Sequence, residues 1–195
     1  MNTVTQQTTP KNPVKAQNAI ALLRADHKLV SSLFSEYEKT QSITKKQQIV
    51  SQICTELVAH AKVEEEIFYP AVRRALKDKK VVPEAMVEQA VLKALIAQVQ
   101  DVEPHGEIFD AKIKVISEYV AHHVKREQNE MFPKAKAAKL DMLALGAKMS
   151  ARKAELLAQQ SEGDIYPDDT EAPYAMLVPM RRAGDLVSPY HGNHG

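Results

Sequence analysis

The sequence predicts an all-α protein built around an antiparallel up-down four-helix bundle, with a short fifth helix and extended N- and C-terminal tails. Apolar residues recur at helical spacing over four long stretches, and short turns rich in Ser, Gly or Pro separate these stretches. Strand signals are weak throughout the chain. Four long helices joined by short turns favour a bundle, the arrangement that builds cofactor sites from side chains on facing helices.

The first two helices are expected on either side of a turn at Ser42. Apolar periodicity predicts the first helix over about residues 14–40. Ser42 can cap the second helix, which should continue to about Lys77. Pro70 lies inside this pattern, where its missing N–H and its ring should kink or break the helix.

The third and fourth helices repeat this plan. Pro83 suits the first turn of a third helix that ends before Pro104. The dipeptide His105-Gly106 marks the turn into a fourth helix over about 107–136. Pro133 lies inside the fourth helix at the place that matches the internal proline of the second, so a second kink or break is expected there.

The rest of the chain is divided by composition. Asp141 can cap the fifth helix, which should reach about Gln160. The first residues are rich in Thr, Gln, Asn and Pro, and the last 35 contain Gly, Pro and Asp without periodicity. The expected divisions are a disordered arm over 1–14, the bundle over 15–138, the additional helix over 139–160 and an extended tail over 161–195.

Composition excludes few functions but argues against some partners. With 26 basic and 25 acidic residues, the net charge of +1 gives no electrostatic reason to expect nucleic acid or an anionic membrane. No apolar run approaches membrane-spanning length, and the N-terminus lacks a basic start followed by an apolar run. The single cysteine, Cys54, sits in an apolar helical pattern and is expected to be buried filler. We therefore expect a cytoplasmic protein.

One motif occurs twice, 63 residues apart. His60 is followed by Glu64, His123 is followed by Glu127, and a proline lies ten residues after each histidine. Residues four apart share one face of a helix, and the apolar neighbours of both pairs place that face inward. Buried carboxylates need a cation, a proton or a salt bridge, so the pairs predict a metal site. The alternative is a hydrogen-bonded polar core.

The repeat extends upstream but is chemically unequal. Asp26-His27 precedes the first motif, and Glu88-Gln89 takes the same place before the second. The inward polar residues are thus His27, His60, Glu64, His123 and Glu127, with Gln89 from the remaining helix.

The three segments that carry these residues resemble the hemerythrin-like, or HHE cation-binding, domain over about residues 17–136. They are Leu22-Leu-Arg-Ala-Asp-His27, His60-Ala-Lys-Val-Glu64-Glu-Glu and His123-Val-Lys-Arg-Glu127. The resemblance implies an up-down bundle with a non-haem di-iron centre, in which two glutamates bridge the metals and histidines cap each side. Imidazole and carboxylate ligands suit iron, with manganese possible, whereas structural zinc more often uses thiolates.

Two departures from the family pattern qualify that expectation. Where oxygen-carrying hemerythrins have further ligands, this chain has Gln89 with Lys93 and, after His123, Gln128, which disfavours reversible oxygen carriage. Gln89 is a weak ligand at the expected sixth position, so the second metal is labile, its site is open, or another group replaces the ligand. Glu130 is one possible substitute, and its other interpretation is a solvent-facing carboxylate.

Four functions remain open from sequence. The first is a di-iron protein that senses or binds oxygen, nitric oxide, peroxide or iron. The second is an enzyme that decomposes peroxide or handles nitric oxide at an open iron position. The third is iron storage or delivery. The fourth is a metal-free helical interaction protein with a buried His/Glu network.

Overall fold

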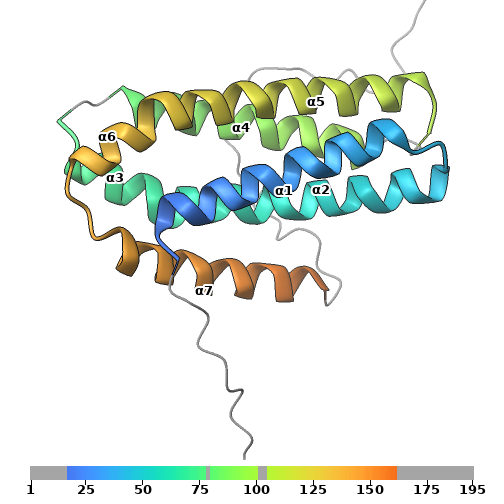
Figure 1. The fold of residues 1–195 in the computed structure, drawn as a ribbon. Coiled ribbons are helices and arrows are strands. Elements are labelled where there is room, and N and C mark those ends of the chain that lie inside the picture. Colours follow the sequence, from blue (N-terminus) through green and yellow to red (C-terminus); the bar gives the residue numbers. More distant parts are fainter. Residues whose placement is uncertain (1–16, 78–79, 101–104, 162–195) are drawn as a thin grey trace, which may run out of the picture.

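The computed structural model describes residues 17–77, 80–100 and 105–161, which form helices and short turns with no strand among them (Figure 1). The elements in chain order are α1 (Ala19–Lys39), α2 (Ile43–Val63), η1 (Glu64–Phe68), α3 (Tyr69–Ala75), α4 (Val81–Gln100), α5 (Glu107–Arg126), η2 (Glu127–Met131), α6 (Phe132–Ala137) and α7 (Met142–Ser161). The two η elements are single π-helical turns. The arm expected over 1–14 and the tail expected beyond residue 161 lie outside the described residues.

Four rods form the bundle: α1, α2 continued by η1 and α3, α4, and α5 continued by η2 and α6 (Figure 1). α1 packs against α2 and α4 packs against α5, with further contacts across the bundle. α7 lies outside the four rods and contacts α1, α2 and η1. The predicted four-helix bundle with an additional helix is therefore confirmed.

Side-chain caps set three of the helix starts. Ser42 and Asp141 accept hydrogen bonds from backbone N–H groups in the first turns of α2 and α7, as predicted. Asn18 does the same for α1, at 2.8 Å. Because Asn18 adopts an extended backbone conformation, α1 begins at Ala19 and not near residue 14.

The prolines inside the second and fourth rods do not break them. The N–H of the residue before Pro70 bonds to the carbonyl of Glu64, and the N–H before Pro133 bonds to the carbonyl of Glu127, each five residues back. These wide π turns accommodate a proline ring that would clash in a regular α-helix. The helical path therefore continues through both prolines, although α6 bends away from the line of α5 (Figure 1).

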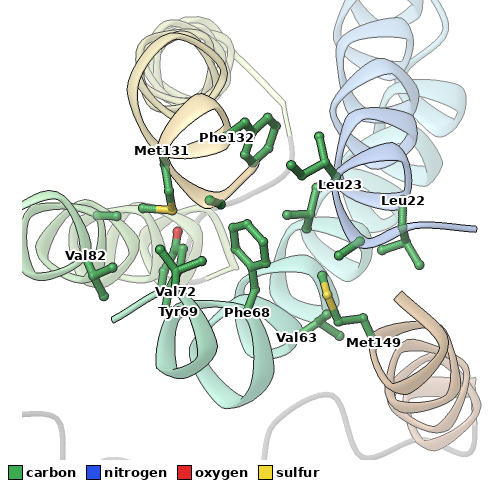
Figure 2. Close-up of a cluster of buried hydrophobic side chains, with 14 of the residues drawn as sticks. Leu22, Leu23, Val63, Phe68, Tyr69, Val72, Val82, Met131, Phe132 and Met149 are labelled. Atoms are coloured by element: carbon green, nitrogen blue, oxygen red, sulfur yellow. The ribbon is translucent and has the colours of Figure 1, made fainter. Parts of the chain in front are cut away.

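Two apolar clusters occupy the core. The cluster in Figure 2 joins side chains from the first turns of α1, the π turns, α3, α6 and α7, including Phe68, Phe132 and Met149, which are fully buried. The second cluster joins the other ends of α1, α2, α4 and α5. Each of the four rods places one or more buried polar side chains between these clusters. The bundle thus contains one buried polar layer, which lies between the two apolar clusters along the bundle axis.

None of the described helices combines the length and apolar character that crossing a bilayer requires.

Candidate metal centre

The polar layer contains every side chain of the inward set that the sequence predicts. Each rod supplies one or two of them, and none is more than 8% exposed. They are His27 from α1, His60 and Glu64 from the second rod, Gln89 from α4, and His123 and Glu127 from the fourth rod. The internal repeat thus brings its two halves face to face.

Four of these residues form a compact donor cluster on the His27 side of the layer. One ligand atom from each of His27, His60, Glu64 and Glu127 lies within 4.8 Å of the others. Nε2 of His27 is 3.3 Å from Oε2 of Glu127, and Nε2 of His60 is 3.3 Å from Oε2 of Glu64. Two imidazoles and two carboxylates at this spacing form a donor set suited to iron or manganese.

The other side of the layer has only one imidazole. Nε2 of His123 lies 3.8 Å from Oε2 of Glu64 and 3.7 Å from Oε2 of Glu127, so it faces both carboxylates. Gln89 occupies the place that His27 has on the first side. Its Nε2 lies 2.5 Å from Oε2 of Glu64 and 3.3 Å from Nε2 of His123.

Several buried atoms of the layer have no hydrogen-bond partner in the described part of the chain. They are Nδ1 and Nε2 of His27, Nε2 of His60, Oε1 of Glu64, Oε1 of Gln89 and Oε2 of Glu127. The 3.3 Å contacts of His27 with Glu127 and of His60 with Glu64 do not have the geometry of a hydrogen bond. Buried polar atoms are nearly always paired, so this concentration of unpaired nitrogen and oxygen atoms needs an explanation. Coordination of cations would satisfy most of these atoms. The residues present therefore fit a metal centre.

The two carboxylates of the layer differ in their affinity for protons. Burial and the negative charge of Glu64 raise the pKa of Glu127 well above its usual range. Burial also acts to raise the pKa of Glu64, but His60 and His123 outweigh it and lower that pKa below its usual value. Without metal, Glu127 therefore holds a proton more readily than Glu64 does.

The histidines differ in the same way. Burial, reinforced by the neighbouring His60, lowers the pKa of His27 to about 3. Burial would also lower the pKa of His123, but the neighbouring carboxylates of Glu64, Glu88 and Glu127 outweigh it and raise that pKa to about 10. At neutral pH the layer without metal therefore contains a neutral His27 and a charged His123.

Two outer carboxylates orient the central histidines. Oδ2 of Asp26 lies 3.4 Å from Nδ1 of His60, and Oε2 of Glu88 lies 2.9 Å from Nδ1 of His123. A carboxylate at Nδ1 fixes the ring and directs Nε2 toward the centre. The sequence shows an acidic residue at the same place in both halves, but its role becomes clear only from the packing of the helices.

Tyr69 also belongs to the polar layer, although it is not among the site residues predicted from the sequence. Its hydroxyl lies 2.9 Å from Oε2 of Glu64 and 3.2 Å from Oε1 of Glu127, so it bridges the two carboxylates. The available signal was an aromatic residue nine positions after each motif histidine, Tyr69 in one half and Phe132 in the other.

Glu130, the possible substitute ligand, is not brought into the centre. Its side chain is 51% exposed, and Oε1 lies 4.0 Å from Nε of Arg126. This position agrees with the solvent-facing interpretation of Glu130. Gln89 therefore remains at the sixth position with no carboxylate from Glu130 beside it.

Comparisons with known proteins agree with the fold and identify the family. Residues 18–135 match the Hemerythrin HHE cation binding domain. A crystal structure of an HHE cation binding domain-containing protein from Mycobacterium kansasii superposes with a TM-score of 0.67 at 18% identity, covering 76% of this chain and 92% of that one.

A DNA nickase from Nostoc sp. (strain PCC 7120) is 32% identical over 111 residues. The match covers 57% of this chain but only 31% of the nickase, so the similarity concerns a part of that protein. Together with the buried His/Glu cluster, the match over 18–135 identifies the chain as a member of the Hemerythrin HHE cation binding domain family.

Proposed function

We propose that this chain binds two iron ions in the polar layer and binds a small ligand, such as oxygen, nitric oxide or peroxide, at the iron position beside Gln89. The observation that carries the proposal is the asymmetry of the layer. Two imidazoles face the carboxylate pair on one side, and one imidazole and an amide face it on the other. A weak or absent ligand leaves room for an exogenous molecule.

The chain supplies ligands for both ions. His27 and His60 hold the first, His123 holds the second, and Glu64 and Glu127 lie between the two positions. Two carboxylates shared by two cations offset charges that would be costly to bury alone. Iron when bound would supply Lewis acidity and redox chemistry toward the small ligand. Manganese is the alternative metal for the same donors.

A cavity supports access on the side that has the open position. It is a small depression, partly open to solvent, with room for about one water-sized molecule, and it lies between α4 and the fourth rod. Its lining consists of Val81, Ala85, Glu88, Arg126, Glu127, Glu130 and Met131. Because Glu127 belongs both to this lining and to the polar layer, a molecule of about the size of water could approach the centre from here.

Turnover of peroxide is a second function, favoured by the position of Tyr69. Burial and the charges of Glu64 and Glu127 raise the pKa of Tyr69 well above its usual value, so the hydroxyl keeps its proton at neutral pH. Its contacts with both carboxylates place a hydrogen-bond donor beside the centre. Such a donor can stabilise negative charge that develops on a peroxide oxygen.

Metal analysis of chain purified without chelators tests the proposal. We expect iron at up to two ions per chain and an absorption spectrum that changes when nitric oxide or peroxide is added. Iron and manganese at trace levels only would reject the metal site. Oxygen evolution from peroxide would favour the enzyme, and a stable spectral change without turnover would favour the binding or sensing protein.

A further inference from the structure

We propose that Lys153 of α7 is a positioning residue for the metal held by His27 and His60, so that metal binding and docking of α7 are coupled. Nζ of Lys153 lies 2.7 Å from Oδ1 of Asp26. The other oxygen of the same carboxylate, Oδ2, lies 3.4 Å from Nδ1 of His60. The inference rests on the proposed metal binding and adds a route from the centre to an element outside the bundle.

The position of Lys153 depends on the docking of α7 as a whole. Met149 and Leu156 of α7 are at most 4% exposed and belong to the apolar cluster shared with α1, η1 and α3. Gly146 lies so close to the start of α1 that an added Cβ would be 2.1 Å from the carbonyl oxygen of Gln17. These contacts fix the position of α7 against α1 and the rest of the bundle.

In this position, Lys153 forms ion pairs with two acidic side chains. Besides Asp26, it contacts Oε2 of Glu56 at 2.9 Å, and all three side chains are no more than 14% exposed. Removing the cation would leave two nearly buried carboxylates facing each other, which is strongly unfavourable. Asp26 would then have to move or lose its contact with His60.

The other half of the layer is built differently. Glu88, which orients His123, contacts Arg126, and Arg126 is the last residue of α5. The cation for that outer carboxylate therefore comes from the bundle itself, three residues after the histidine. In the described part of the chain, only the outer carboxylate of His60 is held by a helix outside the four rods.

This asymmetry has a thermodynamic consequence. If docking of α7 raises metal affinity by some factor, metal binding must stabilise the docking of α7 by the same factor. Loss of a partner outside the ligand shell typically weakens metal binding by about 10- to 100-fold. α7 can thus report the occupancy of the His27/His60 position to the part of the chain that follows it.

The first experiment follows amide hydrogen exchange of the full wild-type chain with and without Fe(II), under anaerobic conditions. We expect Fe(II) to slow exchange in α7, especially around Met149 to Leu156, and not only in the four rods. Fe(II) binding that leaves exchange in α7 unchanged would overturn the inference while the proposed function stands. Absence of Fe(II) binding would overturn both.

The second experiment measures stepwise Fe(II) affinities against a competing chelator in four variants of the full chain. Lys153→Met should weaken one of the two binding steps by about tenfold or more and leave the other unchanged. Lys153→Arg, which keeps the charge, should restore most of the loss.

Two controls separate positioning from simple docking. Lys148→Met changes an exposed lysine of the same helix. Arg152→Met removes the contact between α7 and Glu66, at 2.6 Å, which does not lead to a central histidine. Both should keep wild-type affinities. Equal loss in Lys153→Met and Arg152→Met, or no loss in either, would reject a specific role for Lys153.

Discussion

The amide of Gln89 donates to Oε2 of Glu64 at 2.5 Å, from the position that an imidazole takes in the other half of the bundle. The carboxylate that would be shared by two cations is thus held by imidazoles and by a neutral amide. An amide nitrogen cannot coordinate a cation, and the amide oxygen, Oε1, has no partner among the described residues. The two halves of the site therefore differ in the side chains that directly contact the central carboxylates.

Gln89→His should restore the missing imidazole. We expect the weaker of the two iron-binding steps to tighten at least about tenfold, equivalent to about 1.4 kcal/mol. Titration with Fe(II) under anaerobic conditions measures this change. Gln98→His, at an exposed position of the same helix, is the matched control and should leave both steps unchanged. An unchanged second step in Gln89→His would mean that another group already fills the position.

Glu130→Gln should leave the metal content of the purified protein unchanged, because this side chain is 51% exposed and faces Arg126. Glu127→Gln removes a fully buried carboxylate from the centre and should reduce the iron content of both positions. Elemental analysis of the two variants side by side tests the assignment. Loss of iron in Glu130→Gln would show that this carboxylate moves inward when metal binds.

The fold could be predicted largely because its signals are local. The helical periodicity, the cap at Ser42 and the repeated motif each depend on residues within a few turns of one another. Each proline predicts a kink or a break from local sequence, and the structure shows a π turn before each proline and no end of the helical path. A break at Pro70 follows from the regular α-helix, but the preceding π turn removes the clash without ending the helix.

The parts of the site that could not be predicted depend on contacts between distant elements. Tyr69 belongs to the layer because Glu64 and Glu127 arrive from two different rods. Lys153 reaches Asp26 from 127 residues away along the chain. The repeated aromatic position marks Tyr69 in the sequence but does not show what its hydroxyl contacts, and no spacing marks Lys153. Each contact requires the packing of two helices to be known.

Tyr69→Phe should destabilise the metal-free protein. The hydroxyl contacts both buried carboxyl groups, and its hydrogen bond to the charged Glu64 contributes about 1.5 to 3 kcal/mol. The ring itself fits, since the equivalent position in the other half is Phe132. Urea unfolding in the presence of a chelator measures the loss.

Tyr37→Phe is the control for this change. It removes a hydroxyl that bonds to Asp110, a half-exposed residue far from the polar layer along the bundle. We expect a smaller loss of stability and no change in the absorption spectrum of the iron-loaded protein. A spectrum altered by Tyr37→Phe but not by Tyr69→Phe would contradict the placement of Tyr69 beside the centre.

Metal uptake should release protons and become tighter as the pH rises. Without metal, the pKa of His123, raised to about 10, means that this imidazole carries a proton at pH 7, and the raised pKa of Glu127 favours its protonated form. A cation bound to His123 must displace its proton, so we expect a release of at least about one proton per chain. Calorimetric titration in buffers of different ionisation enthalpy counts them. Uptake that is independent of buffer and pH would show that the metal binds elsewhere.

The two sides of the layer should also give opposite effects of pH on the stability of the metal-free protein. The pKa of His27 falls from about 6.5 in the unfolded chain to about 3 in the folded one. The contribution of His27 to the free energy of unfolding is therefore present above pH 6.5. It is lost as the pH falls toward 3, by at most about 1.4 kcal/mol per pH unit. The pKa of His123 rises instead, so its contribution is present below pH 6.5 and is lost toward pH 10.

His27→Gln and His123→Gln separate these contributions, since Gln89 shows that glutamine fits a position of this layer. Urea unfolding with a chelator present, repeated from pH 5 to pH 9, gives the free energy of unfolding for each variant. His27→Gln should flatten the loss of stability on the acid side, and His123→Gln should flatten the loss on the alkaline side. Identical pH profiles for the two variants would contradict the opposite charges assigned to these histidines, because only residues with different protonation in the folded state can shift stability in opposite directions.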